Sequence, residues 1–470
     1  MSKEARLAKN TAVLAIGNIC TKGISFLLLP LYTSILSTEE YGIVDMVTTY
    51  SGFMAILLTL QLEQGLFRFL VEARGNAALQ RAYTRMVLVT VTVVLAVYVA
   101  AGACVLNRLG YEYTAFLLAN TVVCVLNAII LQIPRGLGDT VAYTIGSFLS
   151  GASTVILNVL FVAILRMGVE GMLAAGILGS AICICYVFGK TKMLMFLVRG
   201  SCRWRDFKPM LTFSLPLIPS ALCWWVIGAS DRVIISYTMG VSFNGIYALA
   251  HKFSSLYNMV SGIFQAAWLE SAYESIDSDD KRAYYHKMIN LTIRFYSACC
   301  LMVIIVVSFV FGIMTNESFA DVYQYIPILM IASMLHSISS LYEAIYLATK
   351  KSTHVMFSVM MTAVINLSVN ILLIRCVGLY AAAGSTLLAY YVLFQLRYSD
   401  MKKRLGISIS GKYLSITAAV YVLSGCGYYF GNIPAKIVSA VVVAIYSYLS
   451  NKEIIHMIYR RITAKIHWNR

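Results

Sequence analysis

The hydrophobic positions of this chain form long runs, and short polar turns separate them. Fourteen runs are long enough to cross a bilayer as helices, which rise about 1.5 Å per residue. We expect these spans at residues 10–36, 41–66, 85–106, 113–133, 143–165, 171–195, 213–238, 246–271, 288–312, 323–348, 355–374, 380–396, 413–430 and 434–450. The pattern predicts an all-α integral membrane protein of about fourteen transmembrane helices without a soluble domain.

Composition agrees with this prediction, because 60% of the 470 residues are hydrophobic and only 12% are charged. A net charge of +16 could suggest a nucleic-acid partner. Most lysines and arginines, however, fall in alternate connections, including the segment 397–412. This is the positive-inside pattern, so we expect both termini in the cytoplasm and no nucleic-acid partner. The basic segments would also attract anionic membrane lipids.

Two short motifs recur along the chain. The stretch 36–42 resembles 239–245, which places Gly42 and Gly245 203 positions apart. The stretch around Gly171 resembles that around Ala381, at the similar offset of 210 positions. Repeats with an even number of spans are parallel, as in many transporters. The pattern predicts a six-helix lobe in 1–199, a second in 200–400, and two extra helices with a basic cytoplasmic tail in 401–470.

The predicted spans 213–238 and 246–271 carry unusual charge for a membrane interior. Asp231, Arg232 and Lys252 lie at membrane depth, where charges are costly and are usually functional. The second of these spans has a polar face with a helical period. Its members are Tyr247, His251, Ser255, Asn258, Gly262 and Gln265. A polar face in a membrane indicates contact with protein or with a water-filled cavity.

Lys22 lies about twelve residues inside the first predicted span, too deep for its amine to reach the interface easily. This depth favours a cavity position over a structural ion pair. For Arg232, two interpretations remain open. It either binds a substrate, or the spans assemble through ion pairs such as Arg232 with Glu270 or Asp231 with Lys252.

Intramembrane carboxylates are candidates for binding a coupling ion, H⁺ or Na⁺. The candidates on polar faces are Asp45, Glu63, Asp231 and Glu343. The sequence contains no metal-ligand cluster, phosphate-binding glycine loop or nucleophile motif. We therefore expect no catalytic residues, no metal, no other cofactor and no enzymatic activity.

Several motifs together resemble a known family, the oligosaccharide-lipid flippases. These Wzx-type proteins are members of the multidrug/oligosaccharidyl-lipid/polysaccharide exporter superfamily. The motifs that carry the resemblance are Pro216 and Pro219, Trp224-Trp225, Ser230-Asp231-Arg232, Gly245-Ile246-Tyr247, the stretch 36–42 and the stretch 134–139. The likeness covers most of residues 10–395.

The resemblance implies two lobes around a cavity lined by spans one, two, seven and eight. By alternating access they would move undecaprenyl-diphosphate-linked oligosaccharide to the outer leaflet of the bacterial cytoplasmic membrane, for lipopolysaccharide O-antigen, capsule or exopolysaccharide. Besides this glycan and membrane lipids, a polysaccharide polymerase and a chain-length regulator would be partners. Cations in the cavity would suit the diphosphate. The candidate substrate-binding residues are Lys22, Arg232 and Lys252, with Asn18, Trp224, Tyr247, His251, Asn258 and Gln265.

Three alternatives remain at this stage. A cation-coupled multidrug exporter shares the fold, and Asp45, Glu63 and Asp231 would suit its acidic cavity. A peptidoglycan-precursor flippase shares the cationic cavity. A membrane glycosyltransferase or polymerase is disfavoured because the predicted outer loops are short.

Overall fold

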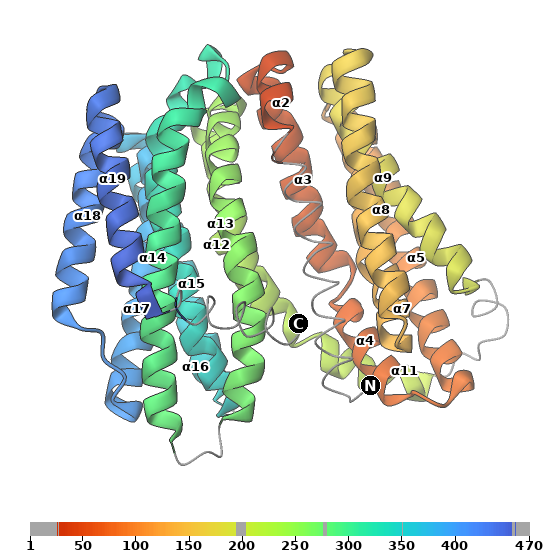
Figure 1. The fold of residues 1–470 in the computed structure, drawn as a ribbon. Helices are drawn as coiled ribbons and strands as arrows, with labels where there is room; N and C mark the ends of the chain where they lie inside the picture. Colours follow the sequence, from red (N-terminus) through yellow and green to blue (C-terminus); the bar gives the residue numbers. More distant parts are fainter. Residues whose placement is uncertain are drawn as a thin grey trace, which may run out of the picture. The chain divides into compact units, whose positions relative to one another are not determined.

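The computed structural model describes residues 26, 28–193, 204–275, 280–349, 351–453 and 456 (Figure 1). Within these residues the regular structure is helical throughout, and no strand occurs. The chain divides into two compact units, Met1–Ala248 and Leu249–Arg470, each with its own internal contacts. The predicted domain boundaries at 199 and 400 remain predictions.

The first unit is a bundle of long and short helices. They are α2 (Leu29–Ile35), α3 (Thr38–Leu58), α4 (Leu62–Glu72), α5 (Ala77–Arg108), α6 (Thr114–Ile130), α7 (Gln132–Leu137), α8 (Thr140–Asn158), a π-helical continuation η1 (Val159–Ile164), α9 (Gly168–Lys190), α11 (Trp204–Ser214), α12 (Leu217–Thr238) and the beginning of α13 (Val241–Glu274). Leu66, Val87, Ile129 and Met210, from α4, α5, α6 and α11, meet in its core.

The second unit contains the rest of α13 and the following helices. These are α14 (Lys281–Met314), a 3₁₀ segment η2 (Glu317–Tyr325), α15 (Ile326–Ala348), α16 (Ser352–Val377), α17 (Leu379–Leu405), α18 (Gly411–Tyr429) and α19 (Ile433–Ser450). Helix α15 packs against α14, α16 and α17 and is largely buried. Helices α18 and α19 pair with each other and lie along α14 (Figure 1).

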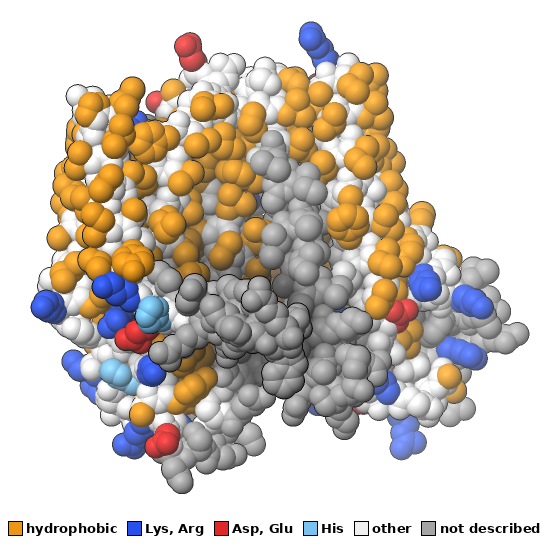
Figure 2. Space-filling view, viewed as in Figure 1, with side chains coloured by type: hydrophobic (Ala, Val, Ile, Leu, Met, Phe, Trp, Pro, Cys, Tyr) orange, Lys and Arg blue, Asp and Glu red, His pale blue; other side chains and the backbone are white. Residues whose placement is uncertain are grey.

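The protein is a multi-pass membrane protein. Among the described residues, eleven helices are long and apolar enough to cross a membrane. Apolar side chains cover much of the visible surface of these helices (Figure 2). Such a surface is stable in lipid rather than in water. The all-α fold is therefore confirmed. The first predicted span falls mostly outside the described residues. The predicted eighth and thirteenth spans coincide with the helices α13 and α18.

The second predicted span, 41–66, was wrong as a single helix. Helix α3 begins at an N-terminal capping box, in which Ser37 and Glu40 satisfy each other's backbone N–H groups, but it ends at Leu58. Leu60 and Gln61 then adopt left-handed backbone angles, with φ of 52° and 56°, and α4 starts afresh. Neither glycine nor proline marks this break, so the sequence carried no signal for it.

Two other boundaries also differ. The predicted spans 213–238 and 246–271 left residues 239–245 as a polar turn, but the turn between α12 and α13 is confined to Met239 and Gly240, where Gly240 has a φ of 107°. Ser242 and Asn244 belong to the first turn of α13. Helix α17 was predicted at 380–396 and continues to Leu405, where Gly406 ends it in the left-handed conformation.

Candidate functional site

Helices α3 and α13 cross at two glycines of the repeated motif, Gly42 and Gly245. A Cβ atom on Gly42 would lie 3.0 Å from Gly245 N and closer still to the Val241 carbonyl oxygen. A Cβ atom on Gly245 would lie 3.1 Å from Gly42 N and overlap the Thr38 carbonyl oxygen. We call this contact the glycine crossing. Only glycine allows such a close approach of two backbones.

The glycine crossing is reciprocal. Thr38 stands in the first motif where Val241 stands in the second, so each glycine meets the carbonyl of the other motif at the equivalent place. Reciprocal contacts of this kind arise when two similar elements meet across a two-fold axis. The hydroxyls of Thr38 and Ser242 add a hydrogen bond of 2.6 Å across the contact.

A polar cluster lies one helical turn from Gly42. It contains Asp45 and Thr49 on α3, Arg232 on α12 and Asn244 on α13, and we call it the Arg232 cluster. Arg232 Nη1 lies 3.4 Å from Asp45 Oδ1 and 3.4 Å from the Thr49 hydroxyl. Asn244 Nδ2 donates to Asp45 Oδ2 at 3.2 Å. The side chains of Arg232 and Asp45 are 22% and 12% exposed, so neither is fully buried by the helices around it.

The guanidinium of Arg232 is only partly used. A tight charge-assisted contact measures about 2.7–2.9 Å, so 3.4 Å to Asp45 is loose. Arginine offers five N–H donors. The Arg232 Nε is buried and has no partner among the described residues. A carboxylate or phosphate oxygen of a ligand could therefore bind here without first breaking a tight pair.

Two other predicted site residues of the first unit, Trp224 and Tyr247, are close in sequence to Arg232 and Asn244 of this cluster. Tyr247 is buried, and its hydroxyl donates to Asp231 Oδ2 at 2.8 Å. Trp225 contacts the ring of Phe53 on α3, with the centroids 4.7 Å apart. Trp224, the predicted aromatic, is partly buried on α12. Asn18 and Lys22 lie outside the described residues, so their roles remain predictions.

The remaining predicted residues belong to the part of α13 in the second unit. Lys252 is exposed there, and His251 and Gln265 are partly buried. Asn258 donates to Ser333 on α15 at 3.3 Å. At Asn258 the predicted polar face therefore packs against protein, whereas Ser255 and Gly262 on the same face are exposed.

The sequence analysis missed one buried charge. Arg397, which it counted among the cytoplasmic charges, is 1% exposed. It contacts Glu343 Oε2 at 2.8 Å, the Ser339 carbonyl at 3.0 Å and the Ser358 hydroxyl at 3.1 Å. Arg397 follows the buried Leu393 by four residues, so it lies on the inner face of α17. The four-residue spacing from Leu393 was the sequence feature that could have indicated the burial of Arg397.

The four predicted coupling carboxylates have different surroundings. Asp45 and Glu343 are each ion-paired with an arginine, and Asp231 accepts from a tyrosine. One oxygen of Glu63, Oε2, is buried without a hydrogen-bond partner among the described residues. Those residues also contain no group of three or more His, Cys, Asp or Glu side chains that could hold a metal ion.

A family model described as "Polysaccharide biosynthesis protein" matches residues 7–269. The chain belongs to this family. This confirms the family resemblance that the sequence motifs indicated, and it associates the chain with polysaccharide biosynthesis.

Solved transporter structures share the fold. The lipid II flippase MurJ in an inward closed conformation superposes with a TM-score of 0.73 at 13% identity, covering 94% of this chain and 100% of that one. An inward-facing multidrug resistance MATE transporter of the MOP superfamily gives 0.61 at 14% identity, covering 83% and 98%. These identities support the fold only. No curated protein matches the sequence.

Proposed function

We propose that the protein is a flippase for undecaprenyl-diphosphate-linked oligosaccharide, which it moves from the inner to the outer leaflet for O-antigen, capsule or exopolysaccharide assembly. Membership in the polysaccharide biosynthesis family and a fold shared with a lipid flippase support this proposal. The observation that carries it is the unused donor capacity of Arg232 in a partly exposed cluster.

The chemistry of the Arg232 cluster suits a diphosphate. A guanidinium can bind two oxygens of one phosphate in parallel, which a lysine amine cannot do with the same geometry. Arg232 is held loosely by Asp45 and Thr49, so a diphosphate oxygen can take the place of Asp45 at Nη1 while another binds Nε. Lys22 and Lys252 would supply further positive charge, and the two lobes would alternate access around the site.

The membrane, the partner proteins and the coupling ion belong to the same proposal. The protein would act in the bacterial cytoplasmic membrane with both termini inside, without catalysis, beside a polymerase and a chain-length regulator. An H⁺ or Na⁺ gradient would act through Asp45, Glu63, Asp231 or Glu343. Neutral amides at these positions should then abolish the ion dependence of transport, and the coupling idea fails if ion dependence survives in all four.

The test is surface polysaccharide display in a strain that lacks its flippase. Arg232→Ala should abolish display while membrane abundance stays normal, and Arg232→Lys should restore it only in part. Arg375→Ala is the matched control, because Arg375 is an exposed arginine at the end of α16. This control should display polysaccharide normally.

A double variant separates cargo binding from assembly. Replacing both members of an ion pair by apolar residues is often neutral for stability. Arg232→Met with Asp45→Leu should therefore reach the membrane and still fail to display polysaccharide. Full display from this variant would show that the pair serves assembly alone. Loss of drug resistance with display intact would favour a multidrug exporter, the alternative that the shared fold with MATE transporters supports.

A further inference from the structure

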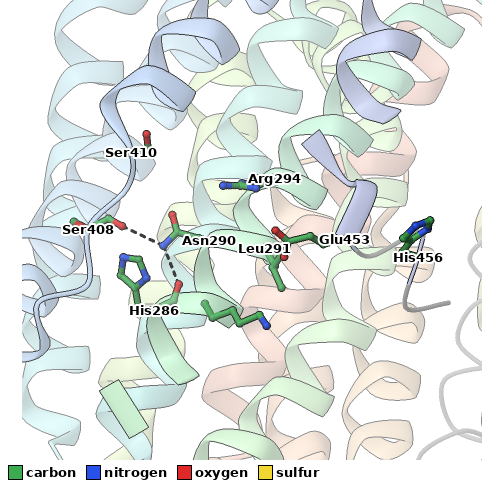
Figure 3. A pocket seen from close by; sticks show the side chains of 9 residues that line it. His286, Asn290, Leu291, Arg294, Ser408, Ser410, Glu453 and His456 are labelled. Atoms are coloured by element: carbon green, nitrogen blue, oxygen red, sulfur yellow. Dashed lines mark hydrogen bonds between the residues drawn. The ribbon is translucent and has the colours of Figure 1, made fainter. Parts of the chain in front are cut away.

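A second polar cavity lies in the second unit, separate from the Arg232 cluster. It has a volume of about 750 Å³ and is bounded by the beginning of α14, the connection between α17 and α18, and the residues after α19. His286, Lys287 and Arg294 come from α14, and Glu453 and His456 come from the chain after α19 (Figure 3). We call this cavity the α14 pocket.

The α14 pocket carries an excess of cationic groups. Lys287 and Arg294 face one acidic residue among the lining residues, Glu453, and two histidines also line the pocket. Arg294 forms no ion pair within 4.0 Å in the described part of the chain, and its Nε is buried without a hydrogen-bond partner there. Its guanidinium lies over the ring of Tyr413, 5.4 Å from the centroid.

The wall of this pocket is held in place. Asn290 Nδ2 donates to the carbonyl of His286 at 2.8 Å and to the carbonyl of Ser408 at 3.1 Å (Figure 3). The bond to Ser408 joins α14 to the connection that precedes α18. The cationic groups are therefore presented by a fixed frame of two segments that are distant in sequence.

An apolar groove adjoins the α14 pocket. It measures about 510 Å³ and shares Arg294 and Ser410 with the pocket. Lys412 lies at the same groove. Its apolar lining comes from α18 and α19: Ile416, Val420, Val442, Ile445 and Leu449. Figure 2 shows basic and histidine side chains at the lower left, beneath an apolar surface. A cationic pocket that opens into an apolar groove matches the two parts of a lipid molecule.

We propose that the α14 pocket and its groove bind an anionic glycerophospholipid, with the phosphodiester at Arg294, Lys287 and Lys412 and an acyl chain along α18 and α19. Basic pockets between transmembrane helices on the cytoplasmic side bind acidic headgroups in this way. Lys287 and Lys412 lie in segments that the charge pattern assigns to the cytoplasm, where the acidic lipids of the inner leaflet are available. The site is independent of the proposed cargo, because a multidrug exporter could carry it equally well.

The experiment measures lipid bound to the purified full-length protein by native mass spectrometry. The protein is taken from bilayer discs that contain phosphatidylglycerol and phosphatidylcholine, or from discs that also contain undecaprenyl diphosphate. Arg294→Ala with Lys412→Ala should weaken phosphatidylglycerol binding roughly 30-fold, from the loss of two cations. Lys402→Ala with Lys403→Ala is the matched control, because both lysines are exposed in the last turn of α17. This control should keep the wild-type occupancy.

A second pair of variants tests the groove and does not alter charge. Ile445→Trp should fill the groove and displace the lipid, whereas Ile437→Trp should not. The two isoleucines lie on α19 and are 54% and 50% exposed, but only Ile445 lines the groove.

Three results would overturn the proposal. One is wild-type phosphatidylglycerol occupancy in both Arg294→Ala/Lys412→Ala and Ile445→Trp. Another is selective loss of undecaprenyl diphosphate with phosphatidylglycerol unchanged, which would assign the pocket to the cargo. The third is displacement of the lipid by inorganic phosphate alone, which would indicate a site for free phosphate.

Discussion

The glycine crossing makes a direct prediction about alanine substitution. In Gly42→Ala the new methyl group would stand 3.0 Å from Gly245 N and nearer to the Val241 carbonyl oxygen. In Gly245→Ala it would meet the Thr38 carbonyl oxygen in the same way. These are backbone atoms, which cannot rotate away as a flexible side chain could. Either variant therefore forces α3 and the beginning of α13 apart.

The size of this effect follows from packing distances. Carbon atoms in good contact are about 3.5–4.0 Å from their neighbours, so the two backbones must separate by roughly 1 Å. Overpacking of this kind costs about 1–3 kcal/mol. That range corresponds to a decrease of about 5- to 150-fold in the population of the crossed arrangement. The separation would also weaken the hydrogen bonds of Thr38 with Ser242 and of Asn244 with Asp45.

The assay is the thermal unfolding midpoint of each purified variant, together with polysaccharide display. Gly262→Ala and Gly384→Ala are the controls, because a Cβ at either position would meet no heavy atom within 4 Å. Alanine is favoured over glycine inside helices by up to about 1 kcal/mol, so these controls should unfold at or above the wild-type temperature. The reasoning is refuted if Gly42→Ala and Gly245→Ala unfold at the temperature of the controls and display polysaccharide normally.

Two further predictions concern buried charge and topology. Arg397→Met should destabilise the protein by about 3–5 kcal/mol, because Glu343 loses its partner. Arg397→Met with Glu343→Leu should recover much of this loss in thermal unfolding, and a double variant no more stable than the single one would contradict the pairing. A cysteine placed at Ser318, in η2, should react with a membrane-impermeant thiol reagent in intact cells, because the charge pattern puts this position outside. Cys202 lies between the predicted sixth and seventh spans, on the cytoplasmic side, and should be protected. The opposite labelling would invert the proposed topology.

The family could be predicted from its sequence motifs. The secondary structure could be predicted because membrane helices satisfy their backbone hydrogen bonds locally. Long apolar runs therefore located most helices within a few residues of their observed bounds. The break after Leu58 escaped prediction because it depends on two left-handed residues that are neither glycine nor proline. The extension of α17 escaped because charged residues after 396 resembled a loop, although Arg397 is buried.

The sequence by itself determined the membrane character, the all-α class, the family and the repeated motif that contains Gly42 and Gly245. Only the tertiary structure decided which charges meet. It placed Arg232 beside Asp45, and it gave Glu343 a partner in Arg397, 54 residues further along the chain. Local periodicity indicates which face of a helix a side chain occupies, but the neighbouring helix on that face is chosen by packing. The ion pairs, the glycine crossing and the α14 pocket all depend on that choice.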